Sequence, residues 1–209
     1  MLVVAIDGPA GAGKSTIARA LAERLGIAHL DTGAMYRAVT LAARRGGWRG
    51  DEAEVADIAR RMTLDVGARV LLDGEDVTGP IRSPEVDVAV SAVAANSAVR
   101  NELRDRQRAW AADHDGGVIE GRDIGSVVFP DAVLKLYLTA SPRVRAERRV
   151  AEHGGDVAAI EADIARRDGN DQGRADGPLT RADGAVVVDT SGMAIDEVLD
   201  EIERLLGEK

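Results

Sequence analysis

The sequence predicts an α/β protein in which a parallel five-stranded sheet carries helices on both faces. Short apolar runs alternate with segments whose apolar residues recur at helical spacing, a pattern typical of covered parallel sheets. The expected strands are Leu2–Asp7, Ile27–Leu30, Val118–Glu120, Val133–Leu138 and Ala185–Val188. The expected helices are 17–25, 34–45, 51–62, 85–112, 142–152, 156–168 and 194–206. Since no long linker interrupts the 209 residues, we expect a single domain over 1–209.

Two stretches depart from this alternation. Asp73-Gly74 lies between two β-prone runs, and because tight hairpin turns need positive φ, this pair predicts a β-hairpin. We therefore expect a small inserted lobe over residues 62–84. The stretch 168–183 is rich in Gly, Asp, Asn and Arg, which favours an irregular loop.

Composition excludes several functional classes. The formal net charge is −9 and only five residues are aromatic, which argues against nucleic-acid binding by charge or by base stacking. Cysteine is absent, so the chain has no disulfide and no thiolate metal site. No apolar run is long enough to span a membrane, and the N-terminus lacks the basic region of a signal peptide. We expect a cytoplasmic protein.

One motif predicts a nucleotide site. Residues 8–15 read Gly8-Pro9-Ala10-Gly11-Ala12-Gly13-Lys14-Ser15 and match G-x-x-x-x-G-K-[ST] between a strand and a helix. The glycines let backbone N–H groups surround phosphate oxygens, and the helix N-terminus adds its positive end. In such a P-loop the lysine reaches the β- and γ-phosphates and the serine hydroxyl binds Mg²⁺. We therefore expect residues 8–16, Thr16 included, to bind ATP, with Ser15 as the metal ligand.

The remaining residues favour a small kinase over other P-loop classes. No Asn-Lys-x-Asp motif for guanine and no Ser-Gly-Gly transporter signature is present. Arginine outnumbers lysine 24 to 3, and its planar fork suits bidentate phosphate binding. Arg37 and Arg122 follow strands at the carboxyl edge of the sheet, where open α/β folds bind ligands. A second anionic substrate site is thus expected.

Four segments resemble the bacterial cytidylate kinase family, in its order and over nearly the whole chain. They are Ile6–Lys14, the run Leu30-Asp31-Thr32-Gly33-Ala34-Met35-Tyr36-Arg37, the block Glu120–Asp131 with Gly121-Arg122-Asp123, and Arg167-Asp168-x-x-Asp171-x-x-Arg174. The resemblance implies a P-loop NTPase-type fold with a helical lid. It also implies transfer of the γ-phosphoryl group of ATP, with Mg²⁺, to CMP or dCMP.

The resemblance also implies a set of substrate contacts. Phosphate contacts fall to Thr32, Arg37 and Arg122, base contacts to Ser91, Arg100 and Asp123, and sugar or phosphate contacts to Arg167, Asp171 and Arg174. The chemistry of cytosine is compatible with this. A carboxylate can accept a hydrogen bond from the N4 amine, while arginine and serine can donate to N3 and O2.

The acceptor phosphate is already anionic at neutral pH, so no general base is required. We expect catalysis by in-line positioning and by the charges of Lys14, Arg37, Arg122 and Mg²⁺. Water must be excluded to prevent ATP hydrolysis, and residues 142–174 are the best candidate for a lid.

Several alternatives stay open at this stage. Another small-molecule P-loop kinase, acting on a different nucleotide or on shikimate, is the nearest rival. Glu120 could hold a water on Mg²⁺ or cap the following turn. Four arginines at the start of the lid could reach ATP or form a solvated helix face: Arg143, Arg145, Arg148 and Arg149. We expect a monomer that binds neither nucleic acid nor membrane.

Overall fold

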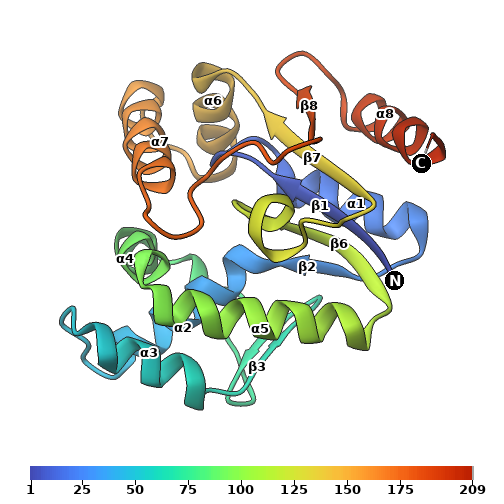
Figure 1. The fold of residues 1–209 in the computed structure, drawn as a ribbon. Helices are drawn as coiled ribbons and strands as arrows, with labels where there is room; N and C mark the ends of the chain where they lie inside the picture. Colours follow the sequence, from blue (N-terminus) through green and yellow to red (C-terminus); the bar gives the residue numbers. More distant parts are fainter. Residues whose placement is uncertain (209) are drawn as a thin grey trace. The chain divides into compact units, whose positions relative to one another are not determined.

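The computed structural model describes residues 1–208 (Figure 1). The described chain divides into two compact units. Unit 1 combines Met1–His29 with the chain from His114 onward, and unit 2 is Leu30–Asp113. Over residues 1–208, no helix combines the length and apolar character needed to cross a bilayer.

The main sheet has five strands, as predicted. In spatial order they are β2 (His29–Asp31), β6 (Gly116–Gly121), β1 (Leu2–Asp7), β7 (Leu134–Thr139) and β8 (Val186–Asp189). The central strand β1 runs parallel to β6 and to β7, and β7 runs parallel to β8. The short strand β2 starts at the last residue of unit 1. The α/β class and the parallel sheet are confirmed.

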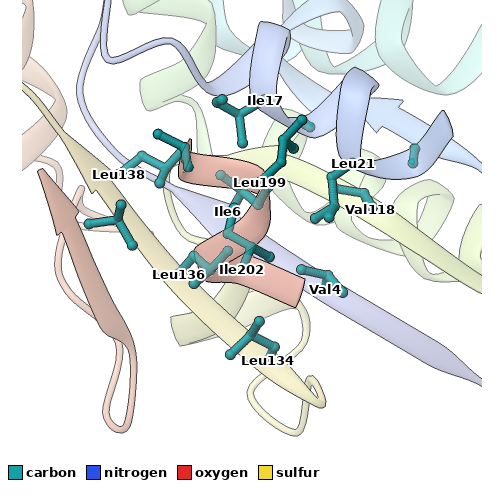
Figure 2. Close-up of a cluster of buried hydrophobic side chains, with 14 of the residues drawn as sticks. Val4, Ile6, Ile17, Leu21, Val118, Leu134, Leu136, Leu138, Leu199 and Ile202 are labelled. Atoms are coloured by element: carbon teal, nitrogen blue, oxygen red, sulfur yellow. The ribbon is translucent and has the colours of Figure 1, made fainter. Parts of the chain in front are cut away.

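Two helices cover one face of this sheet. They are α1 (Lys14–Leu25) and α8 (Ile195–Gly207). Alternate residues of β1, such as Val4 and Ile6, point to this face because side chains in a strand have period two. Figure 2 shows them in one cluster with Ile17 and Leu21 of α1 and with Ile202 of α8. The core is aliphatic, as the scarcity of aromatic residues predicts.

Unit 1 has three further helical elements, and two of them directly follow the carboxyl ends of strands. A π-helix, η2 (Ile124–Val128), comes after β6, and α6 (Pro142–His153) comes after β7. Helix α7 (Val157–Gln172) lies beside α6 (Figure 1). The prediction of an irregular loop from residue 168 is wrong for its first five residues, which are helical. Hydrophobic periodicity missed this turn because its buried side chains, Asp168 and Asp171, are charged.

Unit 2 contains five helical segments and a small sheet. Its elements are α2 (Thr32–Arg45), α3 (Glu52–Arg61), β3 (Leu64–Val66), β4 (Val70–Leu72), β5 (Glu75–Asp76), the 3-10 helix η1 (Pro80–Arg82), α4 (Pro84–Ala95) and α5 (Ser97–Asp113). The predicted hairpin is confirmed. Asp73 and Gly74 join β4 to β5 with φ of 50° and 84°, and β3 adds a third antiparallel strand.

The predicted single helix 85–112 is wrong, because the chain breaks at Asn96 into α4 and α5. The Asn96 side chain accepts hydrogen bonds from the N–H groups of Ala98 (2.9 Å) and Val99 (3.0 Å). These bonds satisfy the free amides at the start of α5 and make a new helix N-terminus favourable. Because Asn96 interrupts a run of apolar residues, the sequence pattern predicted that it lies inside one continuous helix rather than at the start of a second one. Ser91 and Arg100 consequently lie on different helices.

We predict that Gly8→Ala destabilises the protein far more than Gly26→Ala. Both glycines have positive φ, but a Cβ on Gly26 meets nothing within 4 Å, whereas one on Gly8 would lie 2.0 Å from the Leu138 carbonyl oxygen. The expected losses are about 1 kcal/mol for Gly26→Ala and at least about 3 kcal/mol for Gly8→Ala. Denaturant unfolding of both variants measures the difference, and equal losses would contradict the close approach.

Candidate active site

The loop between β1 and α1 leaves a helix N-terminus available to an anion. Gly13 precedes the helix with φ of 84°, no side chain caps the helix, and no acidic residue lies in its first turn. The first N–H groups of α1 and the positive end of its dipole therefore face the loop. Lys14 is buried and donates from Nζ to the Pro9 carbonyl oxygen across the loop (2.8 Å). These are the elements of a phosphate cradle.

A carboxylate of the neighbouring strand binds the serine of this loop. The register of β1 and β6 pairs Ile6 with Glu120, which places Glu120 beside the start of the loop. Ser15 donates from Oγ to Glu120 Oε2 (2.8 Å), and His29 Nε2 lies 3.1 Å from Glu120 Oε1. Mg²⁺ prefers oxygen ligands such as hydroxyl and carboxylate groups, so the side chains of Ser15 and Glu120 are suitable ligands for this ion. Sequence reasoning found no partner for His29, which the fold brings to Glu120.

A second carboxylate joins two of the predicted arginines. Asp171 is buried near the end of α7. It accepts a hydrogen bond from Arg122 Nε (2.9 Å) and another from Arg174. Arg167 lies one helical turn before Asp171 on α7. The structure thus brings Arg122, Asp171 and Arg174 together within unit 1, and one carboxylate orients both guanidinium groups.

A third carboxylate, that of Asp168, ties the helices α6 and α7 to the phosphate loop. Asp168 accepts from the backbone N–H of Ala10 (3.2 Å) and from Arg145 Nη1 (2.5 Å). Arg145 also donates to the carbonyl oxygens of Ala10 (3.0 Å) and Ala140 (3.1 Å). Asp168 belongs to the quoted family motif but was not among the predicted substrate contacts. Its position three residues before Asp171 places both carboxylates on one helix face.

The four arginines left open at the start of α6 have different surroundings. Arg145 is buried and bound to backbone oxygens, while Arg148 donates to the Thr190 carbonyl oxygen (2.6 Å) and to its hydroxyl (3.0 Å). Arg143 is exposed and pairs with Glu147. A hypothetical Cβ on Gly13 would lie 3.5 Å from Arg148 Nη1, so this guanidinium is close to the loop.

A buried aspartate ends β1 just before the phosphate loop. Asp7 is 2% exposed and accepts hydrogen bonds from the N–H groups of Ile124 and Gly125, both at 2.8 Å. Burial raises the pKa of Asp7 from 3.8 to about 6; the two backbone hydrogen bonds oppose this shift, and the nearby negative charge of Asp123 adds to it. Asp123, a predicted base contact, immediately precedes the π-helix and is buried.

The other predicted substrate residues lie in unit 2. Arg37, in the second turn of α2, donates to the Ile81 carbonyl oxygen (3.0 Å) and to Asp87 Oδ1 (2.5 Å). Ser91 follows Asp87 by one turn on α4. Arg100 is 1% exposed and lies over the Tyr36 ring, 5.6 Å from its centroid.

Thr32 is buried at the start of α2. The structure therefore brings the predicted residues together in two groups, one within each unit. Unit 1 holds residues 8–16, Arg122, Asp123, Arg167, Asp171 and Arg174, and unit 2 holds Thr32, Arg37, Ser91 and Arg100. Four of these arginines, namely Arg37, Arg100, Arg122 and Arg174, donate to carboxylate or carbonyl oxygens that hold their guanidinium groups in place.

Known proteins resemble this chain over its full length. A family model described as cytidylate kinase matches residues 4–208. The cytidylate kinase of Symbiobacterium thermophilum is 50% identical, covering 97% of this chain and 95% of the relative. That of Rhodococcus jostii is 48% identical, with coverages of 100% and 96%. Among solved structures, a shikimate kinase from Bacteroides thetaiotaomicron has a TM-score of 0.53 at 13% identity, covering 99% and 98% of the two chains, and shares the fold alone.

The raised pKa of Asp7 predicts a pH-dependent stability term. A carboxyl group with a higher pKa in the folded state binds its proton more tightly there than in the unfolded state. Proton binding by Asp7 therefore adds most to the free energy of unfolding below the unfolded pKa of 3.8. This stabilisation is lost as the pH rises through the folded pKa of about 6. The free energy of unfolding of the unchanged protein, minus that of Asp7→Asn, should fall by about 2 kcal/mol between pH 4 and pH 7. Denaturant unfolding across this range tests it, and parallel curves would contradict the shift.

Proposed function

We propose a reaction and its residues from one premise: this chain belongs to the cytidylate kinase family. It is a phosphotransferase with cytidylate kinase activity, and the family implies ATP as a substrate. The proposed reaction transfers the γ-phosphoryl group of ATP to CMP or dCMP, giving ADP and CDP or dCDP. The observation that carries it is identity near 50% over the whole chain to curated relatives.

We propose that residues 8–16 hold the phosphates of ATP. Support comes from the uncapped N-terminus of α1 and from Lys14, whose charge lies at the loop. The hydroxyl of Ser15, with Glu120 behind it, would hold Mg²⁺ directly or through a water molecule. When bound, Mg²⁺ neutralises charge on the transferred phosphoryl group. Glu120 then serves to orient Ser15, and the pair with His29 orients Glu120 in turn.

The proposed acceptor contacts keep the assignment that the sequence motifs imply. Thr32, Arg37 and Arg122 would bind the acceptor phosphate, Ser91, Arg100 and Asp123 the base, and Arg167, Asp171 and Arg174 the sugar or phosphate. The support is geometric. Asp87 and Asp171 balance the charges of Arg37 and Arg122 and hold them in defined orientations, which lowers the entropy lost on binding a phosphate.

Charge neutralisation is the proposed source of catalysis. A phosphate monoester is an anion at neutral pH and attacks without a general base. Lys14, Arg37 and Arg122 would oppose the negative charge that spreads over the transferred group in the transition state. We further propose that α6 and α7, residues 142–174, form a lid that excludes water. Arg145 of α6 and Asp168 of α7 are hydrogen-bonded to the backbone of Ala10. Through these bonds, binding of ATP to the phosphate loop would change the position of the two helices.

The same proposal treats the protein as a cytoplasmic monomer within one kinase domain. Its large exposed apolar side chains are few, namely Met1, Leu2, Val88, Val133, Val187 and Ile195 among the described residues. Scattered single apolar side chains are ordinary on a monomer surface. Light scattering coupled to size exclusion measures the mass directly.

A panel of acceptors tests the reaction. With ATP and Mg²⁺, CMP and dCMP should give ADP and the diphosphate, whereas AMP, GMP and shikimate should be poor acceptors. Lys14→Ala should lower kcat by at least about 10²-fold with the fold retained, because it removes a charge from the transition state. Coupled ADP release measures both. Equal use of AMP would remove the cytosine assignment, and near-normal turnover by a folded Lys14→Ala protein would remove the role of the loop.

Asp123→Asn and Arg122→Ala separate base recognition from phosphate binding. UMP places a carbonyl oxygen where CMP carries its amine, so the Asp123 carboxylate would face a second acceptor. Such a mismatch costs about 1–3 kcal/mol, or about tenfold to a hundredfold in kcat/KM. Asp123→Asn should therefore lower kcat/KM for CMP and narrow the CMP/UMP ratio.

Arg122→Ala should harm CMP, dCMP and UMP alike, because all three present the same phosphate. The measurement is kcat/KM for these acceptors in both variants. A CMP/UMP ratio that Asp123→Asn leaves unchanged would show that Asp123 does not read the base.

A further inference from the structure

We propose that Asp7 is a positioning residue for base recognition, because its buried carboxylate fixes the segment that carries Arg122 and Asp123. This inference rests on the proposed function, in which Asp123 accepts from the cytosine amine. Asp7 itself belongs to β1 and immediately precedes Gly8 of the phosphate loop. It would act on the acceptor only through its neighbours.

The geometry of the contact is bidentate. Asp7 Oδ1 accepts from the N–H of Ile124 and Oδ2 from the N–H of Gly125, both at 2.8 Å. Two consecutive amides bound by the two oxygens of one carboxylate define both the position and the orientation of the peptide between them. An asparagine at position 7 would have one acceptor oxygen only, and its NH₂ group would face the other amide.

The bound segment is a π-helix, a rare element that is frequent at functional sites. The Asp123 carbonyl oxygen accepts from the N–H groups of Val127 (2.9 Å) and Val128 (3.2 Å), which closes the wide turn. Asp7 binds the next two amides, which a helix N-terminus leaves without an intrahelical partner. Asp123 thus lies between two sets of hydrogen bonds, which restrain its backbone on both sides of the peptide that follows it.

The electrostatics agree with an anchor that is ionised at neutral pH. Burial and the charge of Asp123 raise the pKa of Asp7 to about 6, while the two backbone hydrogen bonds and Lys14 act in the opposite direction. A group that served packing alone would be more stable as an apolar side chain of similar size, because burial of a charge is unfavourable. A retained buried carboxylate therefore fits a requirement for its two acceptor oxygens.

Steady-state kinetics at pH 8 test the proposal, with Asp7→Asn compared with Asp131→Asn. Asp131 is exposed on the turn after the π-helix, so its variant makes the same charge change without touching the anchor. Asp7→Asn should lower the CMP/UMP ratio of kcat/KM by about tenfold or more and leave KM for ATP within about twofold. Asp131→Asn should leave both unchanged. A loss of fold stability alone would reduce all acceptors equally.

Amide hydrogen exchange gives a readout that does not involve substrate. In Asp7→Asn the amides of Ile124 and Gly125 should exchange at least about tenfold faster, while the Leu136 amide on β7 keeps its rate. Unchanged exchange at Ile124 and Gly125 would overturn the anchor. A folded Asp7→Asn protein that keeps its CMP/UMP ratio, when Asp123→Asn narrows it, would also overturn the proposal. A ratio unchanged in Asp123→Asn overturns the base-reading function instead, and this inference with it.

Gly125→Ala perturbs the same segment from the other side if Asp7→Asn does not fold. A Cβ on Gly125 would lie 3.0 Å from Lys135 Cγ and 3.1 Å from its Cδ. Faster amide exchange at Ile124 in Gly125→Ala would report that the added methyl group displaces the π-helix rather than the Lys135 side chain. With that displacement present, the CMP/UMP ratio should narrow, and the double variant with Lys135→Ala should restore it. A displaced segment with an unchanged CMP/UMP ratio would overturn the proposal.

Discussion

The parallel pairing of β1 with β6 is the constraint on which the candidate active site depends. This register sets Ile6 opposite Glu120 and Asp7 opposite Gly121, so both strands end at the same edge of the sheet. The phosphate loop follows one strand and Arg122-Asp123 follows the other, although more than a hundred residues separate them in the chain. A slip of one residue would turn Ile6 out of the apolar cluster and move Glu120 away from Ser15. The free-energy cost of exposing the apolar face therefore also keeps Glu120 beside Ser15.

Buried carboxylates perform much of the organisation around that edge. Asp7 binds the amides of the π-helix, Asp168 binds the loop and Arg145, and Asp171 binds Arg122 and Arg174. Each satisfies donors that would otherwise be buried without acceptors, which is why the acidic groups are tolerated in the interior. Asp87 and Asp171 hold Arg37 and Arg122 in defined orientations. Local positive charge is therefore organised in each unit although the formal net charge is −9.

The shared architecture does not by itself decide which acceptor is phosphorylated. A sheet with a phosphate loop can serve many kinases, so the acceptor has to be decided by side chains beyond the loop. In the function proposed above, those side chains follow β6, lie on α7 and belong to unit 2.

The sequence by itself determined whatever depends on neighbouring residues. Short sequence patterns predicted the loop Gly8–Ser15, the turn at Asp73-Gly74, the five strands and the family motifs. Each of these patterns follows from local backbone chemistry or from the spacing of apolar residues along the chain. Only the tertiary structure decided which buried charges meet. Asp7 reaches Gly125 across 118 residues and Asp168 reaches Ala10 across 158. Helix α7 also continues past residue 168 because ion pairs, which leave no hydrophobic period, bury its last turn. Long-range polar contacts have no local signature, since their free energy arises only when distant backbones come together.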